Sequence, residues 1–173
     1  MIRIISLSFI LLFFFNNHTL SQDKIVFIDI NFVFTNSIAG KDLNLQIEKK
    51  NNELNEKINN FKKDINTKKE KLISQKNVLS PVEYSKKIKE LEIDIEIINS
   101  TISKNNQELS IFKKTIEKEF SKKLNIIIEE YSVKNSISII LKKQDLLMAK
   151  NDLDITKEIL KIFNDKIKKI NIT

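Results

Sequence analysis

The sequence predicts an α+β protein in which a small β-sheet or β-barrel body, formed from both termini, carries a long antiparallel α-helical coiled-coil hairpin arm. Two long heptad-patterned stretches stand on either side of a single turn, Ser80-Pro81-Val82-Glu83. Candidate strands lie near both ends of the chain, outside those stretches. The chain has one glycine and one proline among its 173 residues, which favours long helices and few loops.

Residues 1–21 have the pattern of a secretory signal peptide. Arg3 supplies the positive charge, and residues 4–15 form an uncharged apolar run that is too short for a membrane span of about 20 residues. Thr19 and Ser21 are small enough for a cleavage site. The alternative is an uncleaved N-terminal anchor. Cleavage would leave a chain without histidine, cysteine or arginine.

Residues 22–40 and 134–173 are predicted to form the body, with short helices. Segment 24–30 and segment 137–141 are strand candidates because they are rich in β-branched and apolar residues, and 146–149 is a third candidate. The segments come from opposite ends of the chain, so they must meet in space in order to pair. A body of about 60 residues is small for a stable monomer, which favours an oligomer. We assign to the oligomer-forming body Ile25, Phe27, Ile139 and Leu141.

Side chains that favour helix starts divide the body into shorter elements. Asn31 is expected to cap a short helix over 32–36, and Ser37 is expected to cap the first arm helix. Gly40, in the first turn of that arm helix, costs a little stability. Thr156 is expected to cap a last amphipathic helix.

Residues 41–133 are predicted to form the hairpin arm, with its tip near 79–84. Steps of four and three place one apolar stripe on each helix. The stripe positions are Ile47, Asn51, Leu54, Ile58, Phe61, Ile65, Lys68, Leu72, Gln75 and Leu79, then Tyr84, Ile88, Leu91, Ile95, Ile98, Ile102, Asn105, Leu109, Phe112 and Ile116. Ser80 can cap the returning helix, Pro81 suits its first position, and Glu83 completes a capping box. The first helix is expected to reach about Leu79 and the second about Val133.

The positive charge is concentrated at the tip of the arm. Segment 62–89 holds nine lysines and three acids, a net charge of +6 in a chain whose total is +7. The candidate binding residues are Lys62, Lys63, Lys68, Lys69, Lys71, Lys76, Lys86, Lys87 and Lys89. They can attract anionic lipid, lipopolysaccharide or acidic parts of a protein client, or they can serve only as a solubilising face. Nucleic acid is disfavoured because the exported chain would lack arginine.

The sequence does not predict an enzyme. The single glycine, Gly40, excludes a glycine-rich phosphate loop, and the exported chain would have no Ser-His or Cys-His pair. Glu90, Glu92, Asp94 and Glu96 form an acidic stretch, which we interpret as a solvated helix face rather than a metal or acid–base site. We expect no cofactor and no metal. Apolar residues off the stripe either form a client surface or broaden the core: Leu43, Leu45, Ile73, Ile93 and Ile97.

The order of these parts resembles the Skp (OmpH-like) family of periplasmic chaperones. A signal peptide leads into Lys24-Ile25-Val26-Phe27-Ile28-Asp29-Ile30, and then into a segment that contains Val33-Phe34 and Ser37-Ile38-Ala39-Gly40-Lys41. The long hairpin follows, and Asp154-Ile155-Thr156 precedes the last helix. The resemblance covers essentially the whole exported chain. Each motif is short, but their order around a heptad hairpin is much more specific.

The resemblance implies a periplasmic homotrimer with a shared β-barrel body and three arms around a cavity. Its implied function is that of an ATP-independent holdase, which binds unfolded outer-membrane proteins on their way to the outer membrane. The arm lysines would correspond to a region associated with lipopolysaccharide and acidic lipid. A dedicated lipopolysaccharide site is less well supported, because the arginines of some members are missing here. Two alternatives remain: a structural coiled-coil adaptor in the periplasm, and a membrane-surface binding protein.

Overall fold

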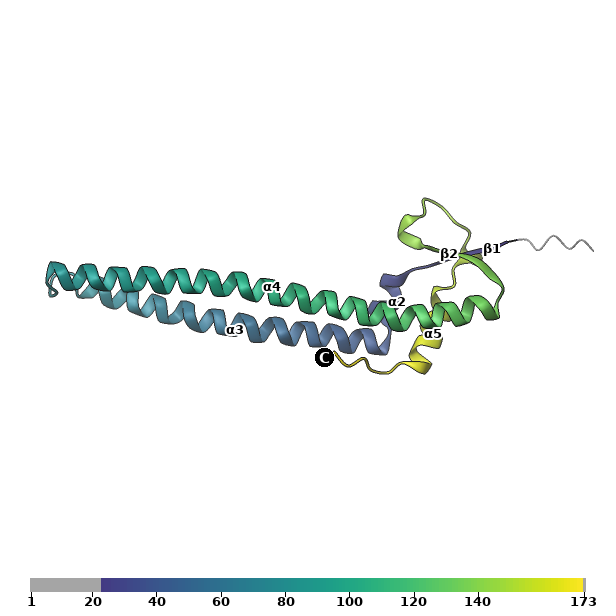
Figure 1. The fold of residues 1–173 in the computed structure, drawn as a ribbon, viewed down its shortest axis with the longest axis horizontal. Coiled ribbons are helices and arrows are strands. Elements are labelled where there is room, and N and C mark those ends of the chain that lie inside the picture. The colour runs from purple at the N-terminus through teal and green to yellow at the C-terminus, as the bar shows by residue number, and fades with distance from the viewer. Residues whose placement is uncertain (1–22, 173) are drawn as a thin grey trace, which may run out of the picture.

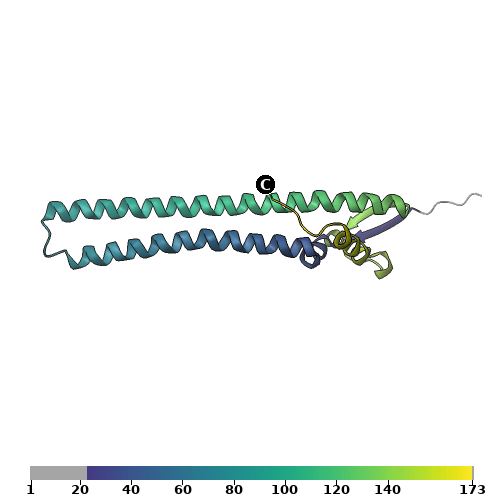
Figure 2. The same ribbon diagram turned by 90° about the horizontal axis from the view of Figure 1, so that it is seen from below.

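A long helical hairpin projects from a small mixed body in the computed structural model, which describes residues 23–172 (Figure 1). The arm consists of α3 (Ile38–Ser74) and α4 (Pro81–Lys134), which run antiparallel and side by side in both views (Figures 1 and 2). The body contains β1 (Lys24–Ile28), α2 (Ile30–Asn36), β2 (Ile137–Lys142) and α5 (Thr156–Lys166). The expected signal peptide lies outside the described residues.

The turn at the tip is built as the sequence predicts. Ser80 is the N-cap of α4, Pro81 stands in the first turn, and Ser80 and Glu83 form a reciprocal capping box. The Glu83 amide donates to Ser80 Oγ at 3.3 Å, and the Ser80 amide donates to Glu83 Oε2 at 3.1 Å. Because Ser80 precedes a proline, it must be extended, and its ψ is 152°.

The first arm helix ends at Ser74, earlier than the expected Leu79. The amides of Val78 and Leu79 both donate to the carbonyl of Gln75, so the chain reverses here. The reversal has to be complete before the extended residue Ser80. Residues 75–80 therefore form the connection between the two helices.

The capping box also affects the pKa of the Glu83 carboxyl, which can be measured by titration. Hydrogen bonds from the Ser80 hydroxyl and the Ser80 amide, with nearby Lys87, lower the pKa of the Glu83 carboxyl. A lowered pKa stabilises the folded turn above the ordinary glutamate pKa, and this stabilisation is lost as pH falls through the lowered value. We expect NMR titration to give Glu83 a midpoint below that of an ordinary glutamate. Ser80→Ala should raise that midpoint, whereas Ser85→Ala, on the same turn, should leave it unchanged.

The predicted apolar stripes face each other along the hairpin. Leu54, Ile58 and Leu72 of α3 are buried, as are Ile98 and Ile116 of α4. Two polar stripe positions, Asn105 and Lys68, form hydrogen bonds across the contact. The Asn105 amide donates to the carbonyl of Leu54 at 3.3 Å, and Lys68 donates to Asp94 at 2.9 Å. Such polar positions fix the register of the two helices.

The body sheet is assembled from the two ends of the described chain, as expected. β1 and β2 pair in parallel, with Ile25 opposite Ile139 and Phe27 opposite Leu141. The sheet of residues 23–172 has two strands and is not a closed barrel. Its inner face, with Val26 and Ile28, joins an apolar cluster that also contains Phe120, Leu124, Ile127, Ile159 and Phe163.

Two predicted element starts are wrong, because side chains near the strand end have other partners. β1 ends at Ile28, not Ile30, since the Asp29 carboxylate accepts from the Phe32 amide and caps α2. Asn31 therefore lies inside α2 and does not cap it. Thr156 is the first residue of α5, and its Oγ1 accepts from the Asp29 amide at 2.9 Å instead of capping its own helix.

The third strand predicted over 146–149 is also wrong. A short 3₁₀ turn, η2 (Lys143–Asp145), follows β2, and 146–149 pairs with no strand among the described residues. The second edge of β1 is already occupied: the Ile155 amide donates to the Phe27 carbonyl at 3.0 Å, beyond the 3₁₀ turn η3 (Asn151–Leu153). Leu147 and Met148 are left almost fully exposed.

Candidate functional site

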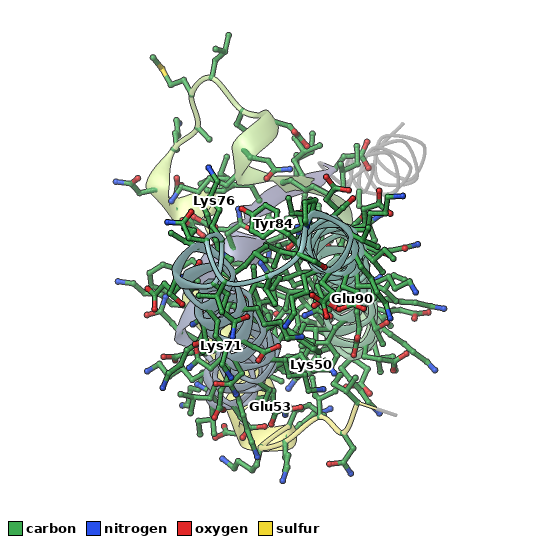
Figure 3. All side chains as sticks on the ribbon, turned by 90° about the vertical axis from the view of Figure 1, so that its left-hand side faces the viewer. Lys50, Glu53, Lys71, Lys76, Tyr84 and Glu90 are labelled. Carbon is green, nitrogen blue, oxygen red and sulfur yellow. The ribbon has the colours of Figure 1, made fainter. Side chains whose placement is uncertain are left out.

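The predicted lysines lie around the far end of the arm, and all nine are exposed. Figure 3 looks along the arm from its tip, with Lys71, Lys76, Tyr84 and Glu90 labelled around the end of the hairpin. The lysines come from α3, from the turn and from the first turns of α4. The hairpin therefore brings together two sets of lysines that are separated in the sequence.

Lys68 differs from the other lysines because its charge is paired. Its Nζ lies 2.9 Å from Asp94 Oδ2 of α4 and 3.0 Å from Asp64 Oδ2 of its own helix. The hydrogen bond to Asp94, followed by that to Asp64, raises the pKa of the Lys68 ammonium. The structure thus places Lys68 in the contact between the helices.

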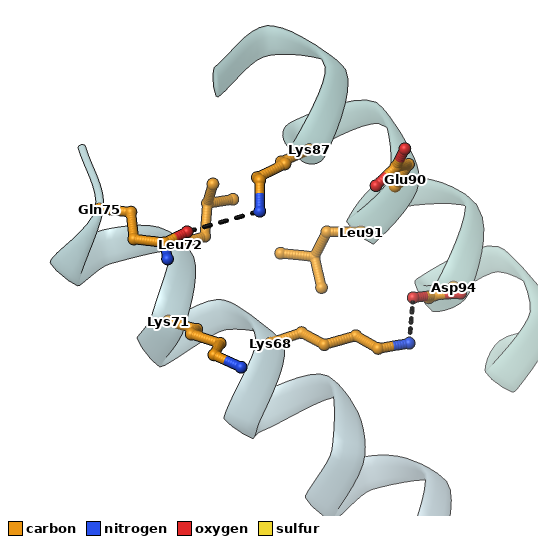
Figure 4. A pocket seen from close by; sticks show the side chains of 8 residues that line it. All are labelled: Lys68, Lys71, Leu72, Gln75, Lys87, Glu90, Leu91 and Asp94. Carbon is orange, nitrogen blue, oxygen red and sulfur yellow. Dashed lines mark hydrogen bonds and ion pairs between the residues drawn. The ribbon is translucent and has the colours of Figure 1, made fainter. Parts of the chain in front are cut away.

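A mixed-charge cavity of about 210 Å³ lies between α3 and α4 near the tip (Figure 4). Lys68, Lys71 and Lys87 line it together with Glu90 and Asp94, and the Lys87 Nζ is 3.5 Å from Gln75 Oε1. Two carboxylates oppose three ammonium groups, so the cavity carries little net charge. We do not assign an anion site to it.

The acidic stretch 90–96 changes where the free positive charge lies. The ion pair between Lys68 and Asp94 places this stretch of α4 beside the middle of the basic segment on α3. Closer to the turn, residues 71–89 contain a single acid, Glu83, which is bound to Ser80. The positive charge nearest the turn is therefore carried by five lysines, of which Lys71 and Lys87 share the cavity with Glu90. We call this set the tip lysines: Lys71, Lys76, Lys86, Lys87 and Lys89.

A second apolar stripe follows the outer face of α4, away from α3. At 100° per residue its members fall within about 60° of one another. Their exposed fractions run from 49% to 77%. We call this set the α4 outer stripe: Ile93, Ile97, Ile111, Ile126 and Val133.

Of this stripe, only Ile93 and Ile97 were recognised from the sequence as apolar residues off the heptad stripe. Gaps of 14 and 15 residues separate Ile97, Ile111 and Ile126, and only their common helical phase would have linked them. Of the other off-stripe residues, Leu43 is fully buried and belongs to the core. Leu45 and Ile73 are exposed, like Ile93 and Ile97.

The outer face of the body sheet is partly apolar and open. Ile25, Phe27, Ile139 and Leu141 share this face by strand register, as their assignment to one surface requires. Phe27 is already buried within the chain, whereas the other three have exposed fractions of 39–46%. Parallel sheets are ordinarily covered on both faces, so this surface is suited to a partner.

These surfaces are exposed, and they combine β-branched side chains with ammonium groups. They can hold an extended polypeptide through many weak apolar and charge contacts. Within residues 23–172, no three His, Cys, Asp or Glu side chains are grouped so that they could hold a metal ion. In the same range, no helix is long and apolar enough to cross a membrane.

Comparison with known proteins agrees with this arrangement. The model of the family described as Outer membrane protein (OmpH-like) matches residues 24–163. The fold is also that of a protein from Caulobacter crescentus CB15, whose crystal structure is described as an outer membrane chaperone (OmpH-like). The TM-score is 0.79 at 12% identity, and the match covers 87% of this chain and 89% of that one. No curated protein matches at a significant level. The family match spans most of the chain, from the first strand to the last helix, and the chain therefore belongs to the OmpH-like outer membrane protein family.

Proposed function

We propose that the chain is an ATP-independent holdase chaperone of the periplasm, which binds unfolded outer-membrane proteins and prevents their aggregation on the way to the outer membrane. The observation that carries the proposal is the α4 outer stripe, a row of exposed aliphatic residues on an arm whose end is basic. Membership in the OmpH-like family supports the same role. Because the affinity would come from many weak contacts, the client could be released at the site where it folds without an energy source.

We propose that the chain acts as a homotrimer. The open face of the sheet supports it, because Ile25, Ile139 and Leu141 remain partly exposed in a single chain. A two-stranded sheet is also marginal on its own. Three such sheets would close into a shared barrel, from which three arms extend around a cavity. Light scattering coupled to size exclusion should give three times the chain mass, and a monomer at micromolar concentration would contradict this assembly.

Holdase activity is tested with the chain that begins at residue 22. A urea-unfolded outer-membrane β-barrel protein is diluted into buffer with a stoichiometric amount of the trimer, and turbidity is recorded. We expect aggregation to be suppressed. Replacing Ile93, Ile97 and Ile111 together by serine should weaken the suppression, whereas replacing the same three by valine should preserve it. Full suppression by the serine variant would exclude this stripe as the client surface.

The tip lysines should accelerate capture more than they increase final affinity. Long-range attraction raises association rates and is screened by salt. Replacing all five by glutamine should lower the association rate for an acidic client about tenfold at low salt, and should remove most of its salt dependence. A matched control replaces five exposed lysines nearer the body: Lys113, Lys114, Lys118, Lys122 and Lys123. Equal effects in stopped-flow fluorescence would show that net charge, and not its position, controls capture.

A membrane-surface role is a second candidate, favoured by two highly exposed valines at the tip. Val78 and Val82 have exposed fractions of 83% and 80% and lie among the tip lysines. Such a mixture suits the interface of an anionic bilayer. Sedimentation with vesicles of phosphatidylglycerol should then depend on salt and on both valines. A structural adaptor, in contrast, would bind one folded partner saturably and would not suppress aggregation of unfolded clients.

A further inference from the structure

The last residues of the described chain fold back onto the arm. Residues 167–172, here called the C-terminal strap, leave the end of α5 and pass beneath the hairpin in Figure 1. Seen from that side in Figure 2, they cross the root of the hairpin toward α4. The strap is extended and belongs to no helix or strand.

Apolar side chains hold the strap in place. Ile170 is 3% exposed and belongs to the same apolar cluster as Leu43 and Ile116 of the hairpin root. Ile167 and Ile172 pack against that cluster and are half-buried. The lysines and the asparagine between them are exposed. An extended segment thus buries Ile170, and half-buries Ile167 and Ile172, against the core at the root of the hairpin, and it turns its polar side chains to solvent.

The strap lacks polar attachments within the part of the chain that the structure describes. The amide of Ile167 still donates to the Phe163 carbonyl at the end of α5. Beyond it, no hydrogen bond or ion pair of residues 168–172 is found among residues 23–172. The strap can therefore leave the surface by giving up apolar contacts alone, without leaving broken hydrogen bonds behind.

We propose that the surface beneath the strap is a docking site for an extended client segment with alternating apolar residues, and that the strap occupies this site until a client displaces it. The proposal rests on the holdase function argued above. The expected occupant of the docking site is a strand segment of a membrane β-barrel protein. Such strands alternate apolar and polar side chains, as Ile170, Asn171 and Ile172 do. The strap is a tethered competitor that keeps the apolar root covered when no client is present.

A tethered competitor lowers the apparent affinity of every other ligand for its site. If the site is free in a tenth of the molecules or fewer, removing the strap should tighten binding by about tenfold or more. The probe is a fluorescein-labelled peptide with the sequence of residues 164–173, added in trans. Ile170→Asp, which frees the strap, and truncation after Lys166 should both bind this peptide at least about tenfold more tightly than the unchanged chain in anisotropy titrations.

Asn171→Asp is the matched control, because it introduces the same carboxylate at an exposed position of the same segment. It should bind the peptide as weakly as the unchanged chain. A synthetic transmembrane-strand peptide from an outer-membrane β-barrel should compete with the labelled peptide on the truncated chain. Equal affinities in all the chains, or no competition by the strand peptide, would overturn the proposal.

A second measurement keeps the three isoleucines of the strap and does not depend on how Ile170→Asp or the truncated chain folds. The chain has no cysteine, so Asn171→Cys carries the only thiol and can be spin-labelled at an exposed site. We expect its electron paramagnetic resonance spectrum to sharpen when an unfolded client is added, because the strap is released. A client that is held without any change in label mobility overturns the strap proposal and leaves the holdase function intact. If the chain does not hold the client at all, both the strap proposal and the holdase proposal are wrong.

Discussion

Replacing Gly40 by alanine is expected to lower the free energy of unfolding by about 2 kcal/mol or more. A Cβ built on Gly40 would lie 1.8 Å from the Phe34 carbonyl oxygen and 2.7 Å from Ser37 Oγ. The first contact is with backbone, which cannot rotate away. The second is with the side chain that caps α3, since Ser37 Oγ accepts from the Gly40 amide at 3.1 Å. Alanine therefore has to separate α2 from α3.

The expected loss of stability is informative because helix propensity alone predicts that Gly40→Ala stabilises the protein. Alanine in a helix is favoured over glycine by about 1 kcal/mol. Here steric overlap should dominate, because neighbouring Val33 and Ala39 are fully buried and leave α2 no room to shift. Urea denaturation followed by far-UV circular dichroism, at one fixed protein concentration, measures the change. Lys41→Ala, at an exposed position of the same turn, should change stability by less than about 0.5 kcal/mol. A Gly40→Ala chain as stable as the parent would refute the close approach.

The hairpin was predictable because its signals are local. Ser80, Pro81 and Glu83 define a helix start within four residues, and the 3-4 rhythm identifies the buried side of each helix. The pairing of β1 with β2 was also predictable, since strand candidates from opposite ends of the chain had to meet in space in order to pair.

The errors arose where distant residues compete for the same groups. Asp29 ends β1 because its carboxylate caps α2, while its amide bonds to Thr156, 127 positions away. That distant bond also diverts the Thr156 hydroxyl from capping its own helix. Neither partner can be identified from local propensity. Gly40 is a similar case, because only the crossing of α2 and α3 shows why a side chain is excluded there.

The sequence predicted that the basic segment lies at the end of the arm, but it did not predict how the charge is distributed there. Counting charges along the sequence treats segment 62–89 as a unit, whereas folding places Asp94 against Lys68. The free charge thereby moves toward the turn. The same folding separates Leu43, which is buried, from Ile93 and Ile97, which are exposed, although all three lie off the heptad stripe.

Replacing Phe120 by alanine should cost about 3–5 kcal/mol, the usual loss for a fully buried aromatic residue. Phe120 is 2% exposed and lies where α4 passes from the hairpin into the body. Its ring centroid is 4.9 Å from that of Phe34 in α2, in an edge-to-face arrangement, and 4.9 Å from that of Phe163 in α5. One side chain of the arm helix α4 thus joins it to α2 and α5 of the body.

The matched control is Phe61→Ala, which removes the same atoms from a stripe position of the arm where the ring is 47% exposed. It should cost well under half as much, because less apolar surface leaves contact with protein. Hydrogen exchange measured by mass spectrometry separates the two effects in space. Phe120→Ala should reduce amide protection in α2, in α5 and in α4 after about residue 112, while the arm near the tip keeps its protection. Similar losses in the two variants, or uniform deprotection of the whole arm by Phe120→Ala, would mean that arm and body unfold as one unit and that Phe120 does not anchor one to the other.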